Sequence, residues 1–130
     1  MTTVLLVEDD EFVRDAFRYA FEDAGLHVRT ENDGSFIRTM KSLDGIDIVV
    51  TDLIMPNVEG VEVILALRDK SPDTPIIAIS GGGRISAKSH LDGVISFGVN
   101  AVFEKPLDEQ TLIQKIRDLT SDTGPAPAQA

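Results

Sequence analysis

The chain has no cysteine, no tryptophan and a single tyrosine among its 130 residues. Without cysteine it can form neither a disulfide framework nor a metal site built from thiolate ligands. No stretch approaches the roughly 18 consecutive apolar residues that cross a bilayer, and the N-terminus lacks the charged and apolar segments of a signal peptide. We therefore expect a cytoplasmic protein that does not enter the membrane.

Basic residues are also scarce, with 12 lysines and arginines against 22 acidic residues and a net charge of −10. Binding to nucleic acid requires a basic face that displaces counterions, so this balance argues against a nucleic-acid partner. Apolar residues make up 42% of the chain, which is enough for one hydrophobic core. The length fits a single domain of common size.

Apolar strands alternate with segments of helical period, the pattern of an α/β domain with a parallel sheet and helices on both faces. The third strand is continuously apolar and should be central, whereas the second alternates with polar residues and should lie at an edge. We assign residues 1–120 to this domain and expect residues 121–130 to form a disordered tail. The five expected strands are Thr3–Val7, Leu26–Thr30, Asp47–Thr51, Ile76–Ile79 and Ala101–Phe103.

Five helices should connect and flank these strands. Asp10 can cap the first helix, Gly25 can end it, and Asp108 can cap the last one. We also expect the phenylalanines of the first half, Phe12 among them, to pack on helix faces. The expected apolar stripes are Val13, Ala16, Phe17, Ala20, Phe21 and Ala24; Phe36, Ile37, Met40 and Leu43; Val58, Val61, Ile64, Leu65 and Leu67; Leu91, Val94, Ile95 and Phe97; and Leu112, Ile113, Ile116 and Leu119.

Polar side chains stand where four of these strands end. Glu8 and Asp9 follow the first strand, Asp52 the third, Ser80 the fourth and Lys105 the fifth. In open α/β sheets the carboxyl ends of the strands form the ligand-binding edge, so these groups should meet there. Neighbouring carboxylates repel one another, and oxygen ligands without histidine or cysteine favour Mg²⁺ or Mn²⁺.

An ionised carboxylate beside such a metal can act as a nucleophile toward phosphorus. Asp52 is the best candidate, because it should lie between the acidic cluster and Lys105. The Lys105 ammonium can reach a phosphate as a point charge, and the Ser80 hydroxyl can donate to a phosphate oxygen.

Four motifs in order make the chain similar to response-regulator receiver domains of two-component signalling. The resemblance covers about residues 3–120 and implies a flavodoxin-like doubly wound sheet of five strands in the order 2-1-3-4-5. It also implies that Asp52 accepts a phosphoryl group from a phosphohistidine on a sensor histidine kinase or a histidine phosphotransfer protein. The motifs are VEDD at Val7–Asp10, TDLIMPNVEG at Thr51–Gly60, ISG at Ile79–Gly81 and EKP at Glu104–Pro106.

The same resemblance implies a role for each site residue. Asp9 and Asp52 would bind Mg²⁺ directly, Glu8 would bind it through water, and the Ile54 backbone carbonyl would be a further ligand. Ser80 would be the switch hydroxyl and Lys105 the family's lysine. The protein would be a signalling phosphoacceptor and not an enzyme with an external substrate.

The expected setting is a stand-alone domain without a DNA-binding output domain. Its output would be a protein contact through the face formed by the fourth helix, the fifth strand and the last helix, or the return of the phosphoryl group to a donor in a phosphorelay. The phosphodonor would dock on the first helix.

One departure from the family's pattern affects signalling. The aromatic residue that usually precedes the lysine by three positions is replaced by Val102, and the adjacent Phe103 should point to the opposite face of the strand. We therefore expect the Gly81–Arg84 loop and the fourth helix to carry the conformational change.

Two other functions remain open alternatives. A Mg²⁺-dependent phosphohydrolase with an aspartyl-phosphate intermediate generally carries an acid two residues after the nucleophile, but Ile54 stands there. Gly82 offers no side chain to orient water, so self-dephosphorylation should be slow. A flavin-binding module would place a phosphate beside the acidic segment Glu8–Glu11, which would repel it.

Overall fold

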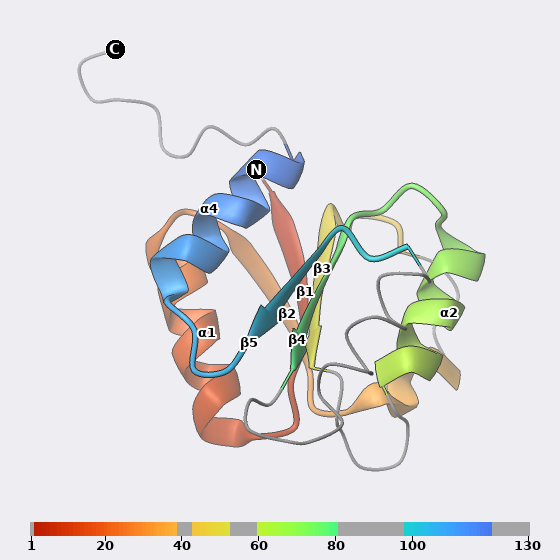
Figure 1. Cartoon of the computed structure of the whole chain (residues 1–130), viewed down its shortest axis with the longest axis horizontal. Helices are drawn as coiled ribbons and strands as arrows, with labels where there is room; N and C mark the ends of the chain where they lie inside the picture. Colours follow the sequence, from red (N-terminus) through yellow and green to blue (C-terminus); the bar gives the residue numbers. More distant parts are fainter. Residues whose placement is uncertain (1, 39–42, 53–59, 81–97, 121–130) are drawn as a thin grey trace.

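The computed structural model describes residues 2–38, 43–52, 60–80 and 98–120, without the side chains of residues 60 and 61. Five parallel strands form one sheet in the order β2-β1-β3-β4-β5, which confirms the predicted fold (Figure 1). The strands are β1 (Thr3–Val7), β2 (His27–Glu31), β3 (Ile48–Asp52), β4 (Ile76–Ser80) and β5 (Ala101–Glu104).

The burial of each strand follows its place in the sheet. All residues of β3 and β4 are buried, as expected for inner strands that are covered on both faces. The edge strand β2 has no fully buried residue. Asp52 and Ser80 are the last residues of β3 and β4. Pairing with the neighbouring strands therefore fixes their main chains, which do not belong to a loop.

Helices cover both faces of the sheet, α1 and α4 on one face and α2 with η1 on the other (Figure 1). Their bounds are Glu11–Asp23 for α1, Gly34–Arg38 for η1, Gly60–Lys70 for α2 and Glu109–Thr120 for α4. The prediction of a second α-helix is wrong within the described residues, since Phe36 and Ile37 lie in the short 3₁₀ helix η1. No helix in the described ranges has the length and apolar content that a membrane span requires.

The predicted caps of two helices are confirmed. The Asp10 carboxylate accepts from the backbone amides of Phe12 and Val13 at the start of α1. The Asp108 carboxylate accepts from the amide and the hydroxyl of Thr111 in α4, and these hydrogen bonds hold its pKa below the ordinary value. Gly25 has a φ of 90° just after α1, a conformation that favours glycine at a helix end.

Strand alternation divides the core into two halves. One half packs beneath α1 and α4, and the other packs beneath α2 and η1. Val102 contributes to the α2 half and Phe103 to the α1–α4 half, so the expectation that they face opposite sides of the sheet is confirmed.

Three expected core residues lie on the surface instead. Phe12 is 87% exposed, Leu65 is 48% exposed and Ala16 is also exposed. At about 100° per residue, Phe12 sits roughly 140° around α1 from the buried Phe17, and Leu65 sits roughly 160° around α2 from the buried Leu67. The angular position of these residues on the helix, and not their apolar side chains, decides that they are exposed.

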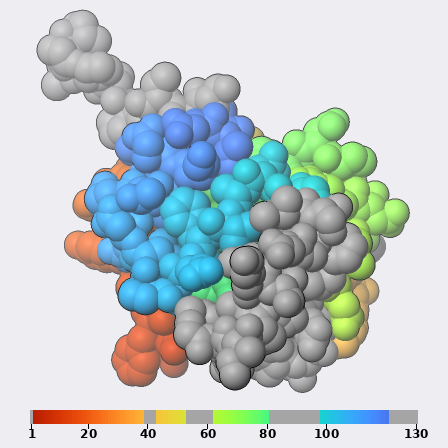
Figure 2. Space-filling model, viewed as in Figure 1, coloured from red at the N-terminus to blue at the C-terminus, as the bar shows by residue number. Residues whose placement is uncertain are grey.

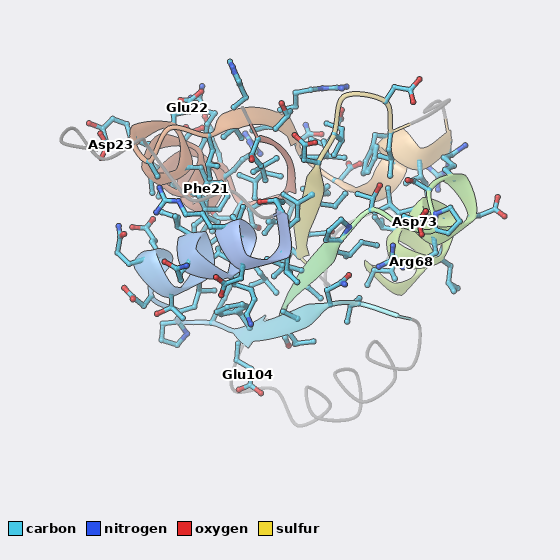
Figure 3. The ribbon with its side chains drawn as sticks, turned by 90° about the horizontal axis from the view of Figure 1, so that it is seen from above. Phe21, Glu22, Asp23, Arg68, Asp73 and Glu104 are labelled. Carbon is cyan, nitrogen blue, oxygen red and sulfur yellow. The ribbon has the colours of Figure 1, made fainter. Side chains whose placement is uncertain are left out.

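Arg68 at the end of α2 organises the amino-terminal edge of the sheet. Its guanidinium donates to the Gly98 carbonyl at 2.7 and 3.2 Å and to the Asn100 side-chain oxygen at 3.0 Å. It also donates to the carbonyls of Pro72 and Thr74. Figure 3 shows Arg68 beside Asp73, on the far side of the molecule from α1.

Candidate functional site

The carboxyl-terminal edge of the sheet brings one ammonium group between two buried carboxylates. Lys105 Nζ donates to Glu8 Oε1 at 2.9 Å and to Asp52 Oδ2 at 3.1 Å. Glu8 is only 1% exposed and Asp52 only 5% exposed. Residues that are 97 and 53 positions apart in the sequence are thus joined at one point of the fold.

Strand parity explains why these three side chains meet. Glu8 continues the alternation of Val4 and Leu6 in the α1–α4 half of the core, and Asp52 continues that of Ile48 and Val50. Lys105 follows Phe103 by two residues and so has the same parity. Residues two positions apart on a strand point to the same face of the sheet, so these three side chains leave their strands on the same face, at the carboxyl-terminal edge.

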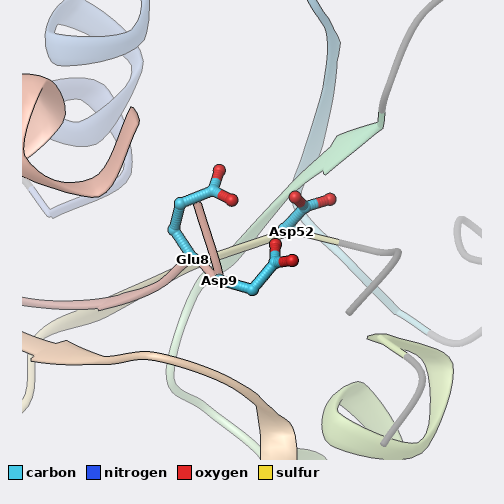
Figure 4. A group of neighbouring side chains, drawn as sticks. All are labelled: Glu8, Asp9 and Asp52. Atoms are coloured by element: carbon cyan, nitrogen blue, oxygen red, sulfur yellow. The ribbon is translucent and has the colours of Figure 1, made fainter. Parts of the chain in front are cut away.

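Asp9 completes a cluster of three acids. Glu8, Asp9 and Asp52 each offer a carboxylate oxygen, and these three atoms lie within 4.8 Å of one another (Figure 4). Asp9 is exposed, so the cluster opens to solvent on its side. Oxygen donors of this kind fit Mg²⁺ or Mn²⁺, and the open side suits an ion that keeps part of its water shell.

Glu8 ionises less readily than an ordinary glutamate. Burial raises the pKa of Glu8 from 4.5 to about 7, and the charge of Asp52 acts in the same direction. The hydrogen bonds from Lys105 and from the Asp10 amide oppose this rise. An added cation would favour the ionised form, so the cluster should bind metal and release protons together.

Lys105 is held in its charged form. Burial lowers the pKa of Lys105, but the hydrogen bonds and charges of Glu8 and Asp52 raise it above the ordinary value. The Lys105 amide donates to the Ser80 carbonyl at 2.8 Å, which fixes the start of the lysine side chain beside the end of β4. Ser80 itself is buried.

The first turn of α1 contains a residue that the sequence analysis missed. Arg14 Nη1, from the first turn of α1, donates to the Glu8 carbonyl at 3.1 Å. A cation is unfavourable beside the positive end of a helix dipole unless it has a specific partner. That position was the available signal, because helix α1 begins at Glu11.

The structure thus brings together four of the predicted site residues, Glu8, Asp9, Asp52 and Lys105, and places Ser80 next to them through the backbone. Ile54 lies outside the described residues. So do the Gly81–Arg84 loop, the predicted fourth helix and the predicted tail. The role assigned to each residue stays a prediction.

Comparison with known proteins identifies relatives over nearly the whole chain. The sequence profile of the response regulator receiver domain matches residues 4–117. The C4-dicarboxylate transport transcriptional regulatory protein DctD of Pseudomonas aeruginosa is 32% identical over 118 residues, which cover 89% of this chain and 24% of DctD. Response regulator MprA of Mycobacterium leprae is 32% identical over 126 residues, which cover 96% of this chain and 54% of MprA.

The chain therefore spans between about a quarter and about half of these curated relatives, and the expectation of a stand-alone domain stays a prediction. Among solved structures, a response regulator receiver domain protein from Clostridium thermocellum superposes with a TM-score of 0.83. The alignment covers 93% of this chain and 95% of that one at 20% identity, which supports the fold.

Proposed function

Because the chain belongs to the response regulator receiver domain family, we propose that it is a phosphoacceptor switch in which Asp52 receives the phosphoryl group. The observation that carries this proposal is the position of Lys105, whose ammonium contacts both Glu8 and Asp52 at the open edge of the sheet. A buried carboxylate with a fixed cation beside it, close to two further acids, has the arrangement that phosphoryl transfer requires.

We propose that Asp9 and Asp52 hold Mg²⁺ or Mn²⁺ directly, with Glu8 acting through water and the Ile54 carbonyl as a further ligand. The proximity of the three acids supports this set, although Ile54 lies outside the described residues. When bound, the metal would offset the negative charge of the carboxylates and of the incoming phosphoryl group.

In the transfer step an Asp52 carboxylate oxygen forms a bond to phosphorus. The bond between phosphorus and the imidazole nitrogen of the donor breaks, and that nitrogen keeps the electron pair and takes up a proton from solvent. The Lys105 ammonium exchanges its contact with Asp52 for one with a phosphoryl oxygen, where it balances the new charge. The Ser80 hydroxyl donates to another phosphoryl oxygen.

The phosphodonor should be a histidine kinase or a histidine phosphotransfer protein that docks on α1. Phe12, Ala16 and Tyr19 form an exposed stripe with helical spacing on α1, and Phe12 is at its first turn, two residues after Asp10. Phe12 and Tyr19 are 87% and 74% exposed, which leaves their apolar surface free for a partner.

The output surface should include β5 and α4. These two segments form one continuous surface in the space-filling view (Figure 2). Lys105 follows β5 directly, so a change in its contacts on phosphorylation would be transmitted to this surface at short range.

Incubation with acetyl phosphate and Mg²⁺, followed by intact mass measurement, tests the proposal. We expect one phosphoryl adduct on the native chain, no adduct after Asp52→Asn, and no adduct with a chelator. Asp23→Asn is the matched control, because it removes an exposed carboxylate at the far end of α1 and should leave the adduct in place. An adduct on Asp52→Asn, or none on the native chain with any phosphodonor, would contradict the proposal.

A further inference from the structure

We propose that Arg14 is a positioning residue for the acidic cluster, a role that rests on the proposed function of this site. Its guanidinium holds the main chain at Glu8 so that the carboxylates of Glu8 and Asp9 are presented to Asp52. Arg14 does not belong to the cluster and acts through the Glu8 carbonyl, which it contacts at 3.1 Å.

Glu8 is held at four atoms, and each contact fixes a different part of the residue. Its amide donates to the Glu31 carbonyl at 3.1 Å, which continues the contact between β1 and β2. Its two carboxylate oxygens accept from Lys105 and from the Asp10 amide at 2.9 and 3.2 Å. Among the described residues, Arg14 is the partner found for the fourth atom, the carbonyl oxygen.

That carbonyl belongs to the peptide unit that joins Glu8 to Asp9. A peptide unit is planar, so holding its oxygen also fixes the direction in which the chain enters Asp9. Within the part of the chain that the structure describes, the Asp9 carboxylate forms no hydrogen bond or ion pair of its own. The orientation of Asp9 therefore depends on its main chain, which Arg14 restrains at the Glu8 carbonyl and the hydrogen bond of the Asp10 amide restrains on the other side.

Arg14 could affect Mg²⁺ affinity in two opposite ways, through its positive charge and through its positioning of the main chain. A cation near an acidic cluster repels a second cation, so charge alone predicts that removing Arg14 tightens Mg²⁺ binding. Loss of positioning predicts that removing it weakens Mg²⁺ binding, because Asp9 is no longer aligned with Asp52. The sign of the change in affinity therefore separates the two roles.

Arg14→Gln should be compared with Arg18→Gln, which removes the same charge from the same helix. Arg18 is half exposed and pairs with Asp15 at 3.6 Å. In Mg²⁺ titrations by calorimetry at fixed pH and ionic strength, we expect Arg14→Gln to weaken binding about tenfold. Arg18→Gln should stay within about twofold of the native chain. Arg14→Lys, which keeps one donor and the charge, should recover part of the loss.

A metal-free readout tests the same role independently. The Asp10 amide that donates to Glu8 should exchange its hydrogen faster in Arg14→Gln than in the native chain without Mg²⁺, while the amides of β3 keep their native rates. Native β3 protection would also show that the variant is folded, and Arg14→Lys serves if Arg14→Gln does not fold.

Equal or tighter Mg²⁺ binding by Arg14→Gln would overturn this inference, as would equal weakening by both glutamine variants. Failure of the proposed function gives a different result, because the native chain itself would then neither bind Mg²⁺ nor form the adduct on Asp52.

Discussion

At each end of the parallel sheet a basic side chain binds several acceptors, but the two sets of acceptors differ in charge. At the amino end, Arg68 donates five hydrogen bonds to four neutral oxygens. At the carboxyl end, Lys105 donates to the carboxylates of Glu8 and Asp52, with Asp9 close by. In the first arrangement all the hydrogen-bond acceptors are neutral, and the single carboxylate that acts on the cation is that of Asp73. The second arrangement has an excess of negative charge.

This difference separates a structural contact from a reactive one. The planar guanidinium of Arg68 is matched by acceptors in fixed positions, and nothing in that arrangement favours a change of partner. Around Lys105, three acids face one ammonium, so two negative charges remain uncompensated when all three acids are ionised. A further cation or a proton is needed there, and the pocket is therefore able to respond to both.

Arg68→Met should produce the largest change in the free energy of unfolding. Arg68 is half-buried, and burial lowers the pKa of its guanidinium although the charge of Asp73 acts in the opposite direction. The carbonyls of Pro72, Thr74 and Gly98 would lose this donor. We expect a loss of about 3 kcal/mol in urea denaturation, since five hydrogen bonds are removed and each contributes about 0.5 kcal/mol or more to stability. Lys70→Met on the same helix is the control, because Lys70 is exposed.

The comparison of the two ends requires that Arg68→Met leave the other edge intact. Its Mg²⁺ affinity should equal that of the native chain. Equal stability of Arg68→Met and Lys70→Met would mean that the Arg68 hydrogen bonds contribute little to stability. A loss of metal affinity in Arg68→Met would mean that the two edges of the sheet are not independent of each other.

Glu8→Gln should show how much the negative charge of Glu8 lowers the free energy of unfolding of the metal-free protein. Because the pKa of Glu8 is raised to about 7 in the folded state, the folded protein binds more protons than the unfolded chain between pH 4.5 and pH 7. Native stability therefore falls as the pH rises through this range. We expect the stability gained by Glu8→Gln to be about 2 kcal/mol larger at pH 8 than at pH 5.

Chemical denaturation with a chelator at the two pH values measures this effect. Glu104→Gln provides the control, since Glu104 is exposed on β5 and its substitution should change stability by less than about 0.5 kcal/mol at both pH values. A gain for Glu8→Gln that did not depend on pH would mean that Glu8 is ionised at little cost, and the contrast with the neutral acceptors of Arg68 would weaken.

Much of the carboxyl edge could be predicted from the sequence, because it depends on strand ends. An apolar run followed by an acid, as at Asp52, indicates both the strand and the place where its last side chain lies. Strand alternation then gathers Glu8, Asp52 and Lys105 without any knowledge of contacts. Phe12 is wrongly expected to pack in the core because it is apolar, although its angular position on α1 already places it on the exposed side of the helix.

The amino edge and Arg14 could not be predicted in the same way. Arg68 and Arg14 bind carbonyl oxygens, and every residue of the chain carries one, so no sequence pattern marks the partner. Which carbonyl an arginine reaches depends on where turns and helix ends lie in space. Those boundaries are the least certain part of any prediction from one sequence.

Mg²⁺ should stabilise the protein by the smallest of these amounts. If the acidic cluster binds the ion only in the folded state, a concentration ten times the Kd adds about 1.4 kcal/mol to the free energy of unfolding. Asp9→Asn should lose most of this increment, because it removes one of the three carboxylates. Arg68→Met should show the full increment above its lower baseline, since its neutral acceptors offer no charge to the ion. Urea denaturation with Mg²⁺ and with a chelator measures each increment, and an equal increment for Asp9→Asn and the native chain would place the metal elsewhere.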